Sequence, residues 1–334
     1  MKNIAVLGCG FGTALSIMCR QMGYDVTLWS PFAEEIAAIR REGEHRKLLP
    51  GIKLPEGIRL TCDLSCTAHA DMILLAVPSH AVRATAQKLA SIISPRCLLV
   101  NVAKGLEEES LLRLSQVIAE ELPQNPLVVL SGPSHAEEVG RGQPTTVVAA
   151  SADHNAAEAV QDLLMNQSLR IYVNDDLTGV ELGGALKNII ALAAGVLDGL
   201  GYGDNAKAAL LTRGITEISR LGCALGARQD TFAGLTGIGD LIVTCTSPHS
   251  RNRRAGILIG QGKTAAEAVA AVGTVEGYRS ARCAYALARR TGVEMPIIEQ
   301  VYQVLFEGKA AGEAVECLMA RPKKHEMERS WLTR

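Results

Sequence analysis

The sequence predicts an α/β domain with a doubly wound parallel sheet, followed by an all-helical domain, in a chain of 334 residues. Up to about residue 176, short apolar segments rich in β-branched residues alternate with helical segments. This alternation is typical of parallel strands covered by helices on both faces. Beyond that point, apolar residues recur at helical spacing and strand-like segments nearly vanish. We therefore expect two domains, residues 1–176 and residues 177–334.

Each expected element rests on its own pattern. Continuous apolar segments predict strands at 4–7, 25–29, 72–77, 97–102, 127–130, 145–150 and 169–173. An apolar-periodic segment at 14–22 predicts the first helix. In the second half, residues 179–221 and 255–318 have helical periodicity, with Pro296 and Pro322 at helix ends. The polar tail, residues 321–334, is expected to fray.

Composition excludes several classes of protein. Hydrophobic residues make up 48% of the chain and the net charge is -1, which argues against a nucleic-acid or membrane-surface protein. Nine scattered cysteines without a leader of sufficient length predict reduced thiols and a cytoplasmic location. The apolar segment 189–196 is interrupted on both sides by polar residues, so we expect no membrane anchor. No cysteine or histidine spacing suits a metal, so we expect no metal.

A glycine-rich turn follows the first expected strand. Gly8, Gly10 and Gly12 lie between that strand and the first helix, with Phe11 among them. A dinucleotide-binding fold needs small residues there for a tight turn and for close approach of the backbone to pyrophosphate. A turn without a ligand is the alternative, but its place at the start of a strand–helix series favours a Rossmann-type cofactor site. The usual third glycine comes three residues after the second, so this loop is one residue short.

The choice between NAD and NADP is open in the sequence. No Asp or Glu ends the strand at 25–29 to accept the ribose 2′-hydroxyl. Ser30 offers a hydroxyl, and no cation follows Trp29 to bind a 2′-phosphate. The absent cation leads us to expect NADH to be used at least as well as NADPH.

Lys187 stands in an otherwise apolar helical segment with Leu186, Ile189 and Ile190. One interpretation is a lysine that extends its stem to reach the surface. The other is a buried lysine whose pKa is lowered enough to move a proton near neutral pH. The spacing alone leaves both open.

A family resemblance adds to these observations. Residues 184–205 match a signature throughout, and further motifs follow in order: Ala103-Lys104-Gly105, Ser131-Gly132-Pro133-Ser134-His135-Ala136, Gly237-Ile238-Gly239-Asp240-Leu241, Ser250-Arg251-Asn252 and Val275-Glu276-Gly277. With these motifs the chain resembles the NAD-dependent glycerol-3-phosphate dehydrogenases over essentially its whole length. The resemblance implies reduction of dihydroxyacetone phosphate to sn-glycerol 3-phosphate with NADH or NADPH, for phospholipid synthesis. It also implies a dinucleotide-binding first domain, a substrate-binding second domain and a homodimer.

The resemblance also implies roles for single residues. Lys187 is expected to be the catalytic proton donor and acceptor. The expected substrate-binding residues are Lys104, Gly132, Ser134, Lys187, Asp240, Ser250, Arg251 and Asn252. The expected cofactor-binding residues are Gly8, Gly10, Phe11, Gly12, Lys104, Ala136, Arg251 and Glu276. The segment before Glu276 is one residue shorter than usual, and the arginine that often follows Trp29 is missing.

Physical chemistry gives each assignment an alternative. Arg251 has the charged, directional donors that a phosphate dianion needs, but a basic stretch is more often a solvated face. Asp240 is expected to orient one of the two lysines, and its alternative is a helix cap or a surface carboxylate. We expect His135 to position or pack rather than to transfer protons. His45, His69 and His154 are expected at the surface.

Two other functions remain open at this stage. A β-hydroxyacid or ketopantoate-type reductase would share the domain plan and a lysine, but would bind a carboxylate instead of a phosphate. The segment Ser250-Arg251-Asn252 is the feature that separates the two enzymes. A catalytically weak NAD(P)H-sensing module is supported by the shortened glycine loop alone.

Overall fold

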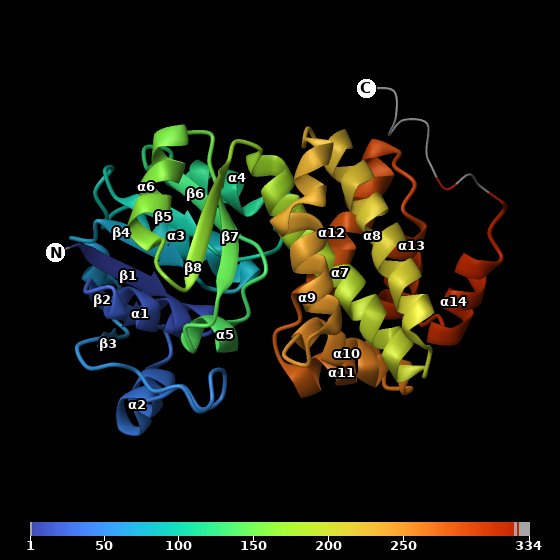
Figure 1. The fold of residues 1–334 in the computed structure, drawn as a ribbon, viewed down its shortest axis with the longest axis horizontal. Helices are drawn as coiled ribbons and strands as arrows, with labels where there is room; N and C mark the ends of the chain where they lie inside the picture. The colour runs from blue at the N-terminus through green and yellow to red at the C-terminus, as the bar shows by residue number, and fades with distance from the viewer. Residues whose placement is uncertain (1, 324–325, 327–334) are drawn as a thin grey trace.

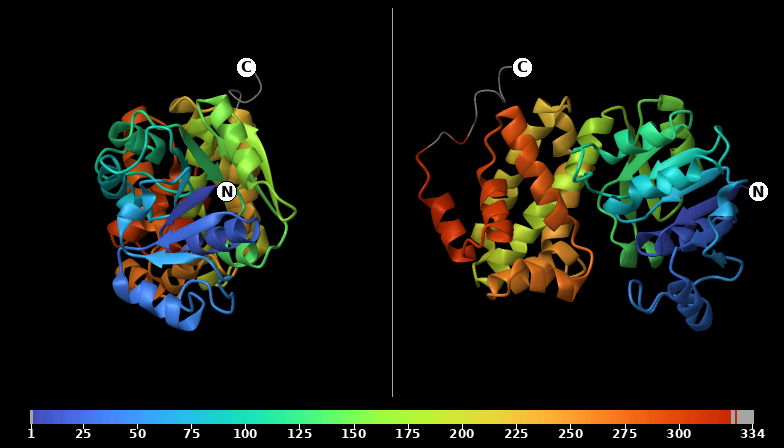
Figure 2. Two further views of the ribbon diagram at one scale, coloured as in Figure 1. Left: turned by 90° about the vertical axis from the view of Figure 1, so that its left-hand side faces the viewer. Right: turned by 180° about the vertical axis from the view of Figure 1, so that it is seen from behind.

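The computed structural model describes residues 2–323 and 326, and places an α/β domain beside a group of packed helices (Figures 1 and 2). Most of the tail expected to fray lies outside the described residues. The α/β domain contains one sheet with strand order β3-β2-β1-β4-β5-β6-β7-β8. The strands are β1 (Asn3–Leu7), β2 (Asp25–Trp29), β3 (Arg59–Thr61), β4 (Met72–Leu75), β5 (Leu98–Asn101), β6 (Leu127–Ser131), β7 (Thr145–Ala150) and β8 (Leu169–Asn174).

The sheet departs from the parallel arrangement at one pair. β6 and β7 are antiparallel, whereas β7 and β8 are parallel again. The connection from β6 to β7 contains only α5 (Ala136–Gly140), a helix of five residues. Such a helix spans about 7–8 Å, about half the length of a five-residue strand, so α5 alone does not carry the chain back to the far edge of the sheet as a longer crossover helix does. The chain instead re-enters from the edge at which β6 ended.

Both faces of the sheet are covered by helices, as predicted. In β1, Ile4 and Val6 pack on one side together with α1 (Phe11–Gln21) and α6 (His154–Leu164). Ala5 and Leu7 face the opposite side, with α3 (Val82–Leu89) and α4 (Leu114–Glu121). The remaining helix of this domain is α2 (Ala33–Glu42), which follows β2. A strand buried on both faces needs apolar residues on both, so the sequence of such a strand shows no alternation of apolar and polar residues.

The second half is entirely helical among the described residues. Its helices are α7 (Leu177–Gly199), α8 (Asp204–Ala224), α9 (Asp240–Thr246), α10 (Arg251–Gly260), α11 (Ala265–Val272), α12 (Glu276–Thr291), α13 (Pro296–Phe306) and α14 (Ala311–Met319). One turn of π-helix, Leu235–Gly239, leads directly into α9. The expected fold class, a doubly wound sheet followed by an all-helical region, is confirmed.

Helix α7 is the central element of the second half. By length and composition it is apolar enough to cross a membrane, yet its apolar stretch is entirely buried by the surrounding protein. In Figure 1 it runs through the middle of the helical region, flanked by α8, α10 and α12. It is therefore a core helix.

α7 and α10 touch through their backbones. Gly195 and Gly199 on α7 face Gly256 and Gly260 on α10, with a three-residue gap in each helix. A Cβ atom on Gly256 would lie 2.0 Å from the Leu192 carbonyl oxygen, and one on Gly195 would lie 2.0 Å from the Arg253 carbonyl oxygen. No side chain larger than hydrogen fits between the two helices at these positions.

Candidate active site

The carboxyl ends of the parallel strands gather several of the expected residues at one sheet edge. The glycine turn follows β1, Ser79 lies beyond β4, Lys104 follows β5, and Gly132 and Ser134 follow β6. This edge is where open α/β sheets bind their ligands. It faces the helical domain, which contributes α7, α9 and the first residue of α12.

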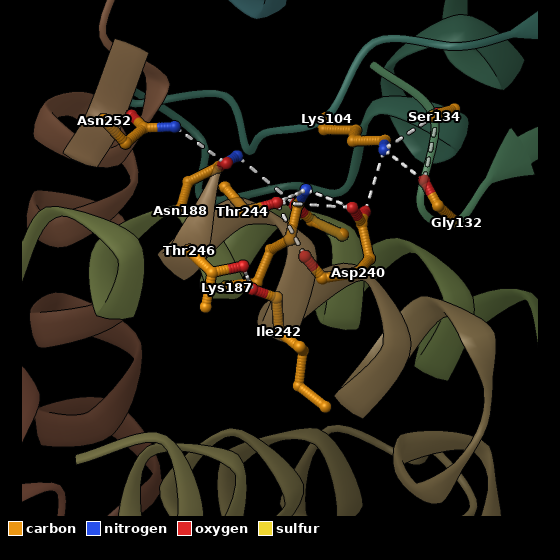
Figure 3. A network of polar contacts seen from close by, with 11 residues as sticks. Lys104, Gly132, Ser134, Lys187, Asn188, Asp240, Ile242, Thr244, Thr246 and Asn252 are labelled. Carbon is orange, nitrogen blue, oxygen red and sulfur yellow. Dashed lines mark hydrogen bonds and ion pairs between the residues drawn. The ribbon is translucent and has the colours of Figure 1, made fainter. Parts of the chain in front are cut away.

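Two lysines share one buried carboxylate at this edge (Figure 3). Asp240, the first residue of α9, is 1% exposed. Its Oδ1 lies 2.5 Å from the Lys187 Nζ, and its Oδ2 lies 2.8 Å from the Lys104 Nζ. The sequence predicted that Asp240 orients one lysine, and the structure shows that it binds both.

Lys187 is buried, so the interpretation of a lysine that reaches the surface is wrong. Its side chain is 6% exposed on the central helix α7. Burial lowers the pKa of Lys187 to about 8, and the charge of Lys104 acts in the same direction, against the opposing charge of Asp240. Burial by itself would raise the pKa of Asp240, but the two lysines outweigh it and hold that pKa below the ordinary value.

Lys104 reaches the same point from the sheet. Its Nζ donates to the Gly132 carbonyl oxygen at 2.8 Å and lies 3.4 Å from the Ser134 Oγ. The Ser134 hydroxyl also donates to the Gly132 carbonyl, at 2.9 Å. Gly132 has a φ of +134°, a conformation that favours glycine, and this turn directs its carbonyl oxygen toward Lys104.

Two further residues belong to this cluster and were missed or discounted in the sequence. Thr244, one helical turn after Asp240, accepts a hydrogen bond from the Lys187 Nζ at 2.6 Å and donates to the Asp240 carbonyl oxygen. Its spacing of four residues from Asp240 on a helix was the available signal. Burial, and then the charge of Lys187, lower the pKa of His135, and its buried Nε2 has no partner among the described residues.

The Ser250-Arg251-Asn252 segment begins α10. The Ser250 Oγ caps the helix by accepting from the Arg253 N–H, which leaves the hydroxyl hydrogen free. Arg251 is exposed and its guanidinium makes no hydrogen bond or ion pair among the described residues. A helix N-terminus with an unengaged arginine is well suited to an anion.

Asn252 connects this segment to α7. Its Nδ2 donates to the Asn188 Oδ1 at 2.9 Å, and its Oδ1 accepts from the Gly277 N–H at 2.8 Å. The hydrogen bond joins the residue after Lys187 to the residue after Arg251. The start of α10 is therefore fixed against the part of α7 that carries Lys187, by buried amides and by the glycine contact between the two helices.

The glycine turn is compatible with a dinucleotide in spite of its short loop. Gly8 has a φ of +110°, and a Cβ there would lie 2.6 Å from the Ala76 carbonyl oxygen, so no other residue fits. A Cβ on Gly12 would lie 2.9 Å from Val6 Cγ1, so Gly12 permits close packing of α1 on β1. Gly10 precedes α1 without a side-chain cap, and the half-buried Phe11 is its first residue. The turn thus retains a free helix N-terminus and small residues.

The two remaining cofactor candidates lie at other helix starts. Ala136 is the first residue of α5, directly after the turn that carries Ser134. Glu276 is the first residue of α12 and accepts from the backbone N–H and the hydroxyl of Ser79, at 3.1 and 2.5 Å. Glu276 therefore ties the helical domain to the loop after β4.

Comparisons with known proteins agree along the whole chain. The family model for the N-terminus of NAD-dependent glycerol-3-phosphate dehydrogenase matches residues 3–157, and the model for the C-terminus matches residues 176–316. The NAD(P)+-dependent glycerol-3-phosphate dehydrogenase of Desulfitobacterium hafniense is 56% identical to this chain over 330 residues. The alignment covers 98% of this chain and 94% of that protein. A protein of the same name from Moorella thermoacetica is 54% identical, with 98% of each chain covered.

A solved structure shows the same fold. The glycerol-3-phosphate dehydrogenase of Coxiella burnetii superposes with a TM-score of 0.92 at 39% identity, over 96% of this chain and 99% of that one. The match therefore includes both domains and the edge where they meet. With its glycine turn, its paired lysines and these relatives, the chain belongs to the family of NAD-dependent glycerol-3-phosphate dehydrogenases.

Proposed function

We propose that this chain interconverts dihydroxyacetone phosphate and sn-glycerol 3-phosphate with NADH or NADPH, and that Lys187 moves the proton. The observation that carries the proposal is the Lys187–Asp240–Lys104 cluster, with Lys187 and Asp240 buried, at the sheet edge that also holds the glycine turn. The cluster has two cations and one anion, so it can receive a developing negative charge.

Lys187 and Lys104 supply the polar chemistry at the reacting oxygen. Reduced nicotinamide, when bound, supplies a hydride to C2 of the ketone. The Lys187 ammonium donates its proton to the C2 oxygen, and Lys104 stabilises the charge that develops there. In the oxidative direction the neutral amine of Lys187 accepts the hydroxyl proton. Asp240 and Thr244 fix the Lys187 Nζ, at 2.5 and 2.6 Å.

Arg251 is proposed to bind the phosphate of the substrate. Arg251 is exposed at the start of α10 and makes no hydrogen bond or ion pair among the described residues, and Ser250 has a free hydroxyl hydrogen beside it. Asn252 has one amide hydrogen left after its bond to Asn188. Together they offer donors of the kind that bind a phosphate dianion.

A substrate comparison tests the proposal. Oxidation of NADH and of NADPH is followed by absorbance with dihydroxyacetone phosphate and, separately, with ketopantoate. Turnover of the phosphate ester alone supports the proposal. Faster turnover of ketopantoate would favour the hydroxyacid reductase, and cofactor binding without any turnover would favour the sensing module.

We further propose a cytoplasmic homodimer whose product feeds glycerophospholipid synthesis. The support is the family and the apolar, alanine-rich helical domain, which is suited to an interface between subunits. Light scattering on the purified protein measures the assembly, and a monomeric mass at working concentration would overturn the dimer.

A further inference from the structure

A carboxylate lies at the end of β2 although the sequence places none there. Ser30, the residue after β2, is 1% exposed, and its Oγ donates to the Glu35 Oε2 at 2.5 Å. Glu35 lies in the first turn of α2, five residues after Ser30, and its side chain points back to the end of β2. The sequence shows no acid at the end of this strand because the carboxylate comes from the following helix.

A buried histidine holds this carboxylate from the other side. The His45 Nε2 lies 3.1 Å from the Glu35 Oε1, and His45 is 4% exposed, so the expected surface position of His45 is also wrong. His69 and His154 are exposed as expected. The Glu35 side chain is one-quarter exposed at 25%, held by two buried partners but open to solvent. The hydrogen bond with His45 contributes most to keeping the pKa of Glu35 below its ordinary value, so the group is anionic at neutral pH.

This cluster adjoins the glycine turn. The Gly8 N–H donates to the Trp29 carbonyl oxygen at 2.9 Å, which joins the turn to the end of β2. Burial, together with the nearby Glu35 carboxylate, raises the pKa of the thiol of Cys9, the residue between the first two glycines. In dinucleotide-binding sheets, a carboxylate beside the first turn at the end of the second strand accepts the ribose hydroxyls of the adenosine.

We propose that Glu35, held by Ser30 and His45, binds the adenosine ribose diol of the cofactor and makes this enzyme prefer NADH over NADPH. The inference rests on the proposed function. A 2′-phosphate placed at the same point would meet an anion.

The cations of the surrounding segment do not offset that anion. Four of them are engaged elsewhere: Arg40 with the Leu60 carbonyl, Arg41 with Glu42, Arg46 with Glu44 and Glu42, and Lys53 with Glu44. Lys47 is exposed and has no hydrogen bond or ion pair among the described residues, so it is the rival determinant that a test must separate.

The test measures binding without turnover. Affinities of NADH, NADPH, ADP-ribose and 2′-phospho-ADP-ribose are determined by calorimetry for the parent, Glu35→Gln, Glu34→Gln and Lys47→Ala. Glu34 is the matched control, because it is the preceding carboxylate on the same helix and is exposed. A parent preference for NADH of about tenfold is expected, because hydrogen bonds to a charged group contribute at this level.

Glu35→Gln should weaken the binding of NADH and ADP-ribose by about tenfold. The affinities for NADPH and 2′-phospho-ADP-ribose should be unchanged or higher, so the preference for NADH over NADPH should disappear. Glu34→Gln should bind all four ligands as the parent does. A parent that binds NADPH more tightly overturns the inference even if Glu35→Gln fails to fold. An unchanged ratio of NADH to NADPH affinity in folded Glu35→Gln also overturns it. So does a loss of NADPH affinity in Lys47→Ala that is larger than the change that Glu35→Gln causes in NADH affinity. In each of these cases the proposed function is retained as long as the parent turns over dihydroxyacetone phosphate. A parent that binds cofactor but turns over no dihydroxyacetone phosphate refutes the proposed function instead.

Discussion

The Lys187 Nζ lies 2.5 Å from the Asp240 Oδ1, and both side chains are almost completely buried. A buried ammonium is costly unless an anion compensates it. Asp240 compensates Lys187 and Lys104 together, so the cluster carries one more positive than negative charge while both lysines are protonated. This surplus favours the arrival of an anion or of a developing alkoxide.

Lys187→Met should abolish most turnover and leave the fold intact. Methionine keeps the length and apolar stem of the side chain in a buried position, while Asp240 retains its contact with Lys104. Without the proton donor, kcat should fall by about 10²–10⁴ with little change in NADH affinity. Thermal midpoint, NADH binding and kcat are measured on one preparation. A folded variant that binds NADH and keeps more than about a tenth of parental kcat would make the lysine structural.

The pH dependence should follow Lys187 in opposite senses for the two directions. Reduction needs the ammonium form, so kcat/KM for dihydroxyacetone phosphate should be level at low pH and fall above a pKa of about 8. Oxidation needs the neutral amine, so its kcat/KM should rise with pH and level off beyond the same point. Profiles in both directions measure this.

Asp240→Asn provides the control for that titration. The Asp240 charge raises the pKa of Lys187. Its removal should therefore move the pH at which kcat/KM falls in reduction, or rises in oxidation, to a lower value. A limb at the parental position in the folded variant would mean that another group titrates.

Arg251→Ala should raise the KM for dihydroxyacetone phosphate far more than it changes stability. The residue is exposed and makes no hydrogen bond or ion pair among the described residues, so the fold loses little. A lost charge-assisted phosphate contact should weaken substrate binding by about 1.5–3 kcal/mol. Arg254→Ala, an exposed arginine on the same helix, is the matched control. If Arg251→Ala stays within about twofold of the parental KM, Arg251 does not bind the phosphate.

Gly256→Ala should destabilise the helical domain, because the new methyl group would lie 2.0 Å from the Leu192 carbonyl oxygen. Overpacking of this kind costs about 1–3 kcal/mol or more. Gly312→Ala, in α14 with no atom within 4 Å of the added methyl, should be neutral or stabilise by up to about 1 kcal/mol. Denaturant unfolding of both variants measures the difference, and equal stabilities would show that α7 and α10 can separate at no cost.

Glu217 should make stability depend on pH. Burial raises the pKa of this carboxyl to about 7, although it accepts bonds from the backbone N–H groups of Ile297 and Ile298. Because the folded pKa exceeds the unfolded value, its contribution is full below about pH 4.5 and is lost as the pH rises to about 7. Glu217→Gln cannot ionise, so the loss of stability between pH 5 and pH 8 should shrink by about 1.4 kcal/mol per unit of pKa difference. Thermal melts across that range provide the measurement, and an unchanged slope would count against Glu217.

The strands were predictable because their apolar runs are continuous, and β7 (Thr145–Ala150) has the predicted bounds. β3 escaped prediction because it has three residues, none of them buried, so it leaves no apolar run. The direction of β7 also escaped, since it depends on the shortness of α5 and not on the strand's own residues.

The meeting of Lys104, Lys187 and Asp240 was predictable because each residue lies in a sequence motif of the family, and the roles assigned to them stay predictions. Thr244 and Glu35 carry no such motif. Their importance comes from contacts that only the folded chain creates: Thr244 with the Lys187 Nζ, and Glu35 with Ser30 and His45. A residue that reaches a strand end from the next helix has no fixed spacing to read.

The glycine contact between α7 and α10 fixes the distance between the backbones of the two helices. Lys187 lies two turns before Gly195 on one helix, and Arg251 lies five residues before Gly256 on the other. With backbone against backbone, no change of side-chain rotamer between the helices can move the backbone at the start of α10 relative to the backbone of α7 that carries Lys187. Under the proposed function, Lys187 acts on the C2 oxygen and Arg251 binds the phosphate, so a substrate with a different number of carbons would have to be accommodated by these side chains and by the loops, because the helix backbones have no room to move closer.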